Sequence, residues 1–214
     1  MSNGRIIKWV GAFALVILLA CAAAIAAETA TSYNEDPTVG ETGWGQVCAR
    51  AMVAYFEGKV EIGIISAGEL PQLGPMPKAG EIPDWDSLKD IDFVLAKISG
   101  ADLTTALSRS VKYLPRKNTS FLHLEGVTVL CKRTGETNEV SAVTIGAKPI
   151  VPAQVYRIAT TKFLAAGGGP FVGLKSLKLV SKEPHSLARQ IRLKLFPRGR
   201  VAPPESSYFF PPEQ

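Results

Sequence analysis

The feature that most constrains the fold is an uncharged run of 18 residues, Val10 to Ala27, near the start of the chain. Arg5 and Lys8 precede this run, and small residues end it, which is the pattern of a secretion signal. A signal of this kind takes no part in the folded domain. Roughly 185 of the 214 residues then remain to fold, which suits one domain of ordinary size.

Three processing routes fit this N-terminal segment. Ala24-Ile25-Ala26 matches a small-x-small cleavage site, which would release a soluble protein. Leu18-Leu19-Ala20-Cys21 resembles a bacterial lipobox, so Cys21 is a candidate for lipidation. The run is also just long enough to remain as a membrane anchor. All three routes predict an exported protein of the periplasm or cell envelope, with residues 1–27 as signal or anchor and residues 28–41 as linker.

Export would place Cys48 and Cys131 in an oxidising compartment, where they form an even pair. One interpretation is a disulfide between them. The other is two buried free thiols, because Cys48 lies on an apolar helix stripe and Cys131 at the end of a strand. Neither cysteine has the spacing of a metal ligand, and His123 and His185 are the only histidines. We therefore expect no metal site and no cofactor in this chain.

The net charge of +5 invites a nucleic-acid interpretation, but the distribution of charge argues against it. Residues 1–174 carry 16 basic and 16 acidic residues, whereas residues 175–214 carry 8 and 3. The main domain is therefore balanced, and no nucleic-acid partner is expected. The basic C-terminal segment predicts either contact with an anionic membrane surface or a solvated helix face and tail. Its basic residues are Lys175, Lys178, Lys182, Arg189, Arg192, Lys194, Arg198 and Arg200.

The hydrophobic periodicity predicts an α+β fold, with few helices and a mixed sheet. Helical spacing of apolar residues begins after Thr42, the expected N-cap, and Gly58 ends that helix. Further helices are expected from Ser99 to about Lys112 and over residues 183–196. Short alternating runs predict strands at residues 60–65, 93–98, 121–124, 127–132, 140–145 and 155–160. Residues 204–214 are rich in proline and are expected to be a flexible tail, with an apolar spot at residues 208–210.

Five sequence words in this order resemble the C-terminal domain of the 5'-nucleotidase family. The best of them, residues 156–168, is similar to the family's Tyr-x-Val-Ala-Thr-x-x-Phe-Leu-x-x-Gly-Gly. The others lie at residues 44–52, 60–68, 97–103 and 121–127. The similarity covers residues 42–203. It implies the α+β fold of that domain and a role in binding a nucleoside, a nucleotide or another small ligand.

The same resemblance implies that ligand binding and hydrolysis belong to different domains. In the family, a separate N-terminal metallophosphoesterase domain holds two metals and performs the hydrolysis. The present sequence has no Asp-x-His and no Asn-His-Glu word, so we assign no catalytic residue. A separate metallophosphoesterase chain is then a candidate partner.

The expected binding half is altered at the positions that match the family's phosphate-binding words. Ser66-Ala67-Gly68-Glu69-Leu70-Pro71 stands where the family has Asn-x-Gly-Gly-Ile-Arg. The arginine fork that suits a phosphate is thus replaced by proline, and a carboxylate is added at Glu69. Gly167-Gly168-Gly169-Pro170-Phe171 stands where the family has Gly-Gly-Asp-Gly-Tyr. We expect that the scaffold is kept and that phosphate recognition is lost or remodelled.

The candidate ligand-binding residues come from these two words, with Phe163 added from the word at residues 156–168. The glycine loop would cradle a phosphate with backbone N–H groups, and the two phenylalanines would sandwich a planar ligand. The corresponding structural interpretations are a tight turn for the glycines and solvated loop positions for Ser66 and Glu69. For the aromatics the alternative is a core position, which Phe163 favours more than Phe171. The candidates are Ser66, Gly68, Glu69, Phe163, Gly167, Gly168, Gly169 and Phe171.

Three functional hypotheses follow from the sequence. The first is a non-catalytic ligand-binding or interaction module of the 5'-nucleotidase C-terminal type. The second is the substrate-recognition subunit of a split hydrolase in nucleotide catabolism. The third is a membrane-tethered structural protein of the cell envelope.

Overall fold

The computed structural model describes residues 35–70, 91–181, 183–191 and 206–210. The chain divides into residues 1–32 and residues 33–214, and every described residue belongs to the second unit. None of the described helices is both long enough and apolar enough to cross a bilayer. Several expectations lie outside the described residues: the signal, Cys21, and the basic residues Lys182, Arg192, Lys194, Arg198 and Arg200.

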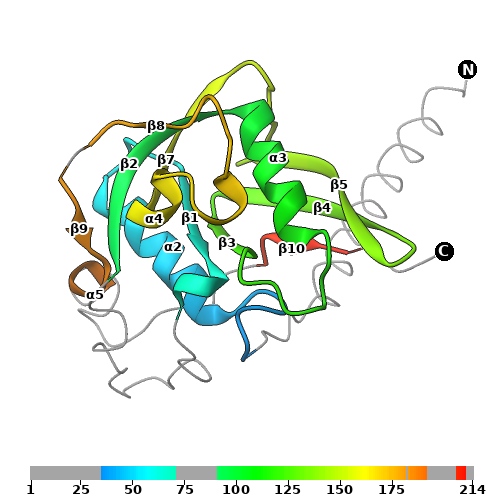
Figure 1. The fold of residues 1–214 in the computed structure, drawn as a ribbon. Helices are drawn as coiled ribbons and strands as arrows, with labels where there is room; N and C mark the ends of the chain where they lie inside the picture. Colours follow the sequence, from blue (N-terminus) through cyan, green and yellow to red (C-terminus); the bar gives the residue numbers. More distant parts are fainter. Residues whose placement is uncertain (1–34, 71–90, 182, 192–205, 211–214) are drawn as a thin grey trace, which may run out of the picture. The chain divides into compact units, whose positions relative to one another are not determined.

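A central sheet of mixed direction organises the fold (Figure 1). Its strand order is β3-β1-β7-β2-β8, and β9 also pairs with β2. β1 and β7 run parallel, whereas the other pairs are antiparallel. The bounds are β1 Ile62–Ser66, β2 Asp92–Ser99, β3 Leu122–Glu125, β7 Val155–Thr161, β8 Lys178–Leu179 and β9 His185–Ser186. The predicted α+β class with a mixed sheet is confirmed.

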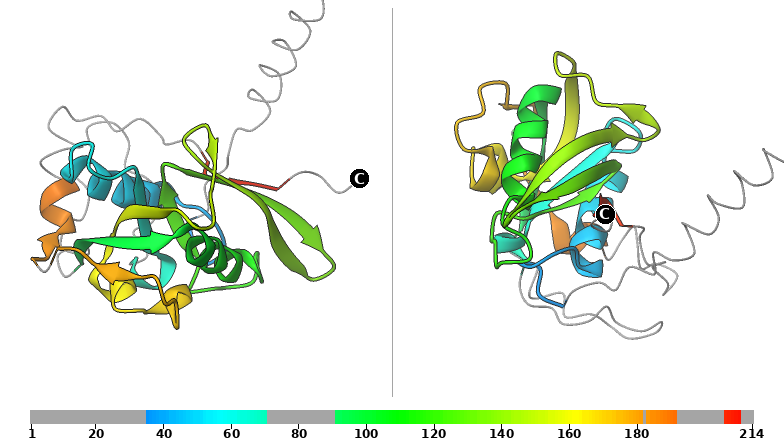
Figure 2. Two further views of the ribbon diagram at one scale, coloured as in Figure 1. Left: turned by 90° about the horizontal axis from the view of Figure 1, so that it is seen from above. Right: turned by 90° about the vertical axis from the view of Figure 1, so that its right-hand side faces the viewer.

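Both faces of the central sheet are buried, because its strands carry apolar side chains on both sides. Ile62 and Ile64 of β1 belong to the cluster that includes helix α3 (Gly100–Val111), whereas Ile65 belongs to the cluster beneath helix α2 (Gly43–Tyr55). Figure 2 shows the two helices on opposite sides of the sheet. Gly63 lets α2 approach closely, since a Cβ there would lie 2.3 Å from the Ala49 carbonyl oxygen.

Side-chain caps fix the starts of both long helices. The Thr42 hydroxyl accepts a hydrogen bond from the Gly45 N–H at 3.0 Å, and the Ser99 hydroxyl accepts one from the Asp102 N–H at 3.2 Å. Each cap satisfies an N–H group that the first turn of a helix leaves unpaired. These caps confirm the predicted starts of α2 and α3.

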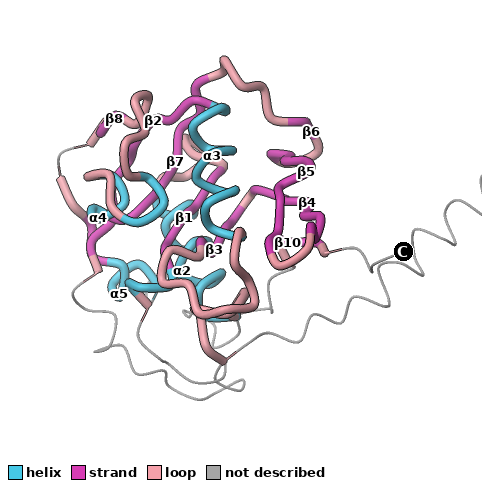
Figure 3. Tube along the Cα trace, turned by 45° about the vertical axis from the view of Figure 1, so that its right-hand side comes forward, coloured by secondary structure: helices cyan, strands magenta, loops and turns pink. Residues whose placement is uncertain are grey.

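A second sheet has the strand order β10-β4-β5-β6 and lies beside α3 (Figure 3). Its bounds are β4 Val127–Thr134, β5 Thr137–Ile145, β6 Lys148–Pro149 and β10 Tyr208–Phe209. β4 and β5 form an antiparallel hairpin, and Gly135 at its turn has a φ of 62°.

The expected helix over residues 183–196 is wrong at its start. His185 and Ser186 form β9 and pair with Phe93 and Asp92 of β2, and helix α5 (Leu187–Gln190) begins after them. The edge of β2 offers unpaired backbone groups, which capture this segment before the helix begins.

The expected flexible tail is also wrong for residues 206–210. Tyr208 pairs with Val129 in a parallel ladder, and its buried hydroxyl donates a hydrogen bond to the Leu122 carbonyl at 2.8 Å. The Glu41 carboxylate accepts hydrogen bonds from the Ser206 hydroxyl and from the backbone N–H of Ser207, at 3.0 Å for the latter. Proline content alone could not reveal this clamp, because its two halves lie 165 residues apart in the chain.

Cys48 and Cys131 are both buried free thiols in the structure. They belong to different apolar clusters, one beneath α2 and the other with α3. The disulfide interpretation is therefore wrong. Burial raises the pKa of each thiol to about 12, so neither forms a reactive thiolate near neutral pH.

A pair of substitutions tests the docking of β10. Tyr208→Ala should lower the free energy of unfolding by about 3–5 kcal/mol, because it empties a core position and removes a buried hydrogen bond. Phe209→Ala, on the same strand but exposed, should cost less than about 1 kcal/mol. Urea unfolding measures both. Equal and small losses would mean that β10 is not docked.

Candidate functional site

The parallel pairing of β1 with β7 brings two distant sequence words together. Ile62 pairs with Ile158 and Ile64 with Thr160, so both strands end at the same edge of the sheet. β1 leads into the short helix η1 (Ala67–Glu69), and β7 leads into α4 (Lys162–Ala165). In open mixed sheets, the carboxyl ends of parallel strands are where ligands usually bind. We call the residues Ser66, Gly68, Glu69, Thr161 and Phe163 the strand-end site.

Glu69 is the centre of the strand-end site. Its Oε2 accepts hydrogen bonds from the Ser66 hydroxyl at 2.7 Å and from the Thr161 hydroxyl at 2.9 Å. Both hydroxyl residues are almost fully buried, with 1% exposure, whereas Glu69 is partly buried. Burial raises the pKa of Glu69, and the hydrogen bonds from Ser66 and Thr161 oppose that rise. The carboxylate thus ties the end of β1 to the end of β7.

Sequence reasoning missed Thr161 as a member of the site. Its hydroxyl accepts a hydrogen bond from the Leu164 N–H at 3.2 Å, which caps α4, while it donates to Glu69. A threonine before a short apolar helix is a recognisable N-cap signal. Its contact with Glu69 depends on the pairing of β1 with β7, which local pattern does not give.

In the expected phosphate cradle, Gly167–Gly169, two of the three backbone N–H groups are already hydrogen-bonded, and so is the N–H of Gly68 in the other candidate turn. The N–H of Gly68 donates to the Thr119 carbonyl at 2.8 Å. The N–H groups of Gly167 and Gly168 donate to the carbonyls of Leu164 and Phe163, at 2.9 and 3.0 Å. The donors of Gly167 and Gly168 are committed to turns, so the tight-turn interpretation describes that loop.

The two candidate aromatics have different environments. Phe163 is 53% exposed, and its ring lies against Gly168, where a Cβ would come within 2.5 Å of ring atoms. Phe171, in the short helix η3 (Gly169–Phe171), is fully buried in the α3 cluster. The expected sandwich of a planar ligand between the two rings is therefore wrong. Of the two rings, Phe163 is the one that offers a face to a ligand.

The two histidines lie in different surroundings. His123 is fully buried, its Nδ1 accepts a hydrogen bond from the Thr42 N–H at 3.4 Å, and burial lowers its pKa to about 3. His185 lies 4.3 Å from the Tyr55 ring, between centroids. No cluster of at least three His, Cys, Asp or Glu side chains suited to a metal ion occurs among the described residues.

Comparison with protein families decides what this scaffold is. The family described as 5'-nucleotidase, C-terminal domain, matches residues 22–176, which is most of the chain. The chain belongs to this family. Members of the 5'-nucleotidase C-terminal domain family are thus its relatives, as the sequence words predicted. A comparison with curated protein sequences found no match.

Solved structures support the same fold. A 5'-nucleotidase precursor from Thermus thermophilus superposes with a TM-score of 0.70 and 18% identity, over 94% of this chain and 44% of that one. A 5'-nucleotidase of Staphylococcus aureus, described as putative and solved with alpha-ketoglutarate, gives 0.63 and 17%, over 81% and 37%. An NAD nucleotidase of Haemophilus influenzae gives 0.59 and 15%, over 80% and 33%. The chain thus spans less than half the length of each.

The contrast between the two phenylalanines is testable. Phe171→Ala should lower the free energy of unfolding by about 3–5 kcal/mol, because it leaves a cavity in a close-packed core. Phe163→Ala should cost less than about 1 kcal/mol, since most of that ring is in water. Chemical denaturation measures both values. A larger loss for Phe163 than for Phe171 would contradict these assignments.

The raised pKa of Glu69 predicts a pH-dependent stability. Because the folded-state pKa lies above the unfolded value, the associated stability is complete below the unfolded pKa and is lost as pH rises through the folded pKa. Glu69→Gln cannot ionise and escapes this loss. The unfolding free energy of the variant, relative to the natural chain, should therefore increase as the pH rises above the ordinary glutamate pKa of about 4.3. Parallel stability curves would refute the raised pKa.

Proposed function

We propose that the chain is an exported, non-catalytic ligand-binding module whose nucleotide pocket has been remodelled to exclude phosphate. The observation that carries this proposal is the partly buried Glu69 carboxylate at the joined ends of β1 and β7. The resemblance to 5'-nucleotidases implies that this turn would contact a substrate phosphate. A carboxylate in partly buried surroundings repels a phosphate more strongly than it would in water.

The same group favours a different kind of ligand. A carboxylate accepts hydrogen bonds from hydroxyl or amino groups, which a neutral ligand can supply. Phe163 lies close to Thr161 in the chain, and its exposed ring offers a stacking surface for a planar group of the ligand. A neutral, planar ligand with hydroxyl groups meets both conditions. A nucleoside is the member of that class to which the family relationship points.

The split hydrolase is the second candidate function, and the exposed Phe163 is the observation that favours it. Two of the similar solved structures are described as a 5'-nucleotidase precursor and an NAD nucleotidase, and a recognition subunit would need an aromatic surface for the base. This candidate requires the nucleotide itself to bind, with a separate metallophosphoesterase chain supplying the metals. The hypothesis of a structural envelope protein has less support, because Tyr208, one residue of the apolar spot at residues 208–210, is buried and unavailable for protein contacts.

Calorimetric titration of the full chain with adenosine and with AMP separates these candidates. The binding module should bind adenosine more tightly than AMP. Phe163→Ala should weaken adenosine binding by about 1–3 kcal/mol through the lost stacking. Val172→Ala removes another exposed apolar side chain, in the segment just after η3, and should leave the affinity unchanged. AMP binding equal to or tighter than adenosine binding would favour the split hydrolase.

A hydrolysis assay tests the non-catalytic part of the proposal. The purified chain is incubated with AMP and Mn²⁺ or Zn²⁺, and released phosphate is measured. We expect release no faster than the metal ion alone produces. Release at an enzyme-like rate, of order 1 per second or more, would show that the chain is catalytic by itself.

A further inference from the structure

Three basic side chains form a row across the central sheet. Lys97 of β2 pairs directly with Arg157 of β7 on one side and with Lys178 of β8 on the other. Directly paired residues in antiparallel strands project from the same face, and adjacent strands are about 5 Å apart. The three cations therefore lie side by side over about 10 Å. We call Arg157, Lys97 and Lys178 the cation row.

Within the described part of the chain, the cation row has no acidic partner. The ion pairs among the described residues involve Arg50, Arg116 and Lys117, and none involves a member of the row. Glu61 is exposed and precedes Ile62, which pairs with Ile158, so the register places Glu61 beside Arg157. The described ion pairs do not include one between Glu61 and Arg157. Like charges directly opposite one another destabilise a sheet. The fold therefore bears an electrostatic cost here that none of the described ion pairs offsets.

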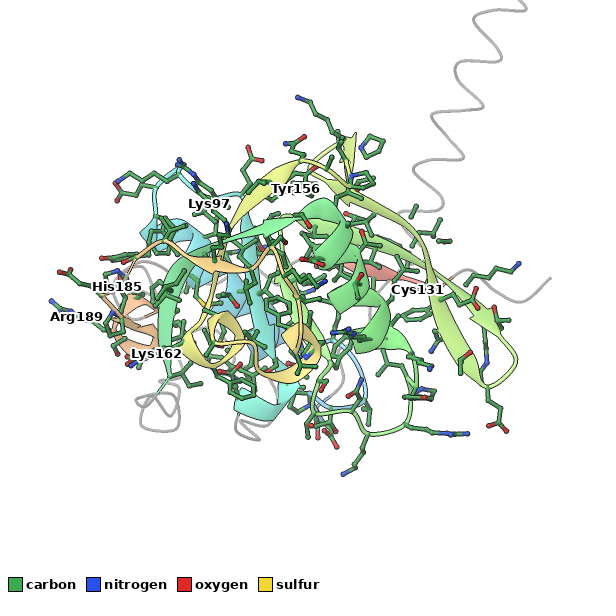
Figure 4. All side chains as sticks on the ribbon, turned by 45° about the horizontal axis from the view of Figure 1, so that its top comes forward. Lys97, Cys131, Tyr156, Lys162, His185 and Arg189 are labelled. Carbon is green, nitrogen blue, oxygen red and sulfur yellow. The ribbon has the colours of Figure 1, made fainter. Side chains whose placement is uncertain are left out.

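The row lies where the sheet face is open. Phe93 and Ala159 bury one end of this face beneath α2, and His185 lies at that end (Figure 4). Lys97 lies towards the other end of β2, where Arg157 and Lys178 are exposed. By strand alternation, Val155 shares the face of Arg157, and it is 58% exposed. Val180, just after β8, is 44% exposed.

We propose that this face docks on an anionic lipid surface, with the cation row on the headgroups and the exposed valines against the interface. Charge complementarity carries the choice of occupant, together with the apolar residues that flank the row. Long basic side chains can reach headgroups while their stems lie on apolar surface. The proposal goes beyond ligand binding at the strand-end site and does not depend on it. The sequence predicted membrane contact through the basic C-terminal segment, whereas this proposal assigns the main contact to the sheet face. Lys178 belongs to both the C-terminal segment and the cation row.

Vesicle cosedimentation of the full chain tests the proposal. The probes are vesicles with about 30 mol% phosphatidylglycerol in phosphatidylcholine, and vesicles of phosphatidylcholine alone. Binding to the neutral vesicles is subtracted, because the apolar residues 10–27 are present in every variant. The natural chain should bind the anionic vesicles, and this binding should fall steeply between about 50 mM and about 300 mM NaCl.

A matched pair of triple variants assigns the binding to the row. Lys97→Gln, Arg157→Gln and Lys178→Gln together should weaken anionic-vesicle binding at least about tenfold. The control, Lys112→Gln, Lys132→Gln and Lys148→Gln together, loses the same charge at exposed positions outside the row and should change binding less than about threefold. Glu61→Gln should strengthen binding, since it removes the carboxylate beside the row.

Other outcomes overturn the proposal. Equal weakening by both triple variants would mean that net charge, and not the row, governs binding. The absence of salt-sensitive binding would remove lipid as the occupant, and tight binding of tripolyphosphate without vesicle binding would assign the row to a soluble polyanion. Lys97→Gln should raise the melting temperature by about 1–3 °C, because it relieves repulsion. A fall in melting temperature would show that Lys97 serves the fold instead.

Discussion

The parallel pairing of β1 with β7 is the contact on which the rest of the molecule depends. It joins residues about a hundred positions apart, and it buries apolar side chains on both faces of the sheet. The α2 cluster and the α3 cluster both rest on these two strands. The same pairing sets the ends of the strands side by side, and so makes one site from η1 and α4. A change that shifted the register of β1 against β7 would therefore disturb the core and the candidate site together.

Two partly buried carboxylates, Glu41 and Glu69, fasten segments that are distant in sequence. Neither has a cationic partner among the described residues, and burial raises the pKa of both. Each instead accepts hydrogen bonds from hydroxyl or N–H donors, which offset part of the cost of burying a charge. Glu41 holds the C-terminal strand, while Glu69 holds the strand-end site.

Sequence patterns predicted much of the fold because the decisive signals are local. Thr42 and Ser99 are recognisable caps, and the alternation of Ile62 and Ile64, with Ile65 on the other face, indicates a strand buried on both sides. The site was only partly predictable. Ser66 and Glu69 followed from a resemblance in local words, whereas Thr161 joins them through strand pairing. Sequence favoured Phe163 as the core ring and left Phe171 open between core and ligand roles. The structure shows the reverse, because Phe171 packs in the α3 cluster and Phe163 is exposed.

The claim that Glu69 excludes phosphate from the strand-end site is tested most directly by a variant with a small residue at position 69. Glu69→Gly removes the carboxylate and returns the glycine that the family words have at this position. The ratio of AMP affinity to adenosine affinity is then compared between the variant and the natural chain by calorimetry. If Glu69 excludes phosphate from the strand-end site, the ratio should rise at least about tenfold in the variant. An unchanged ratio, with both proteins folded, would show that the carboxylate does not determine which ligand binds.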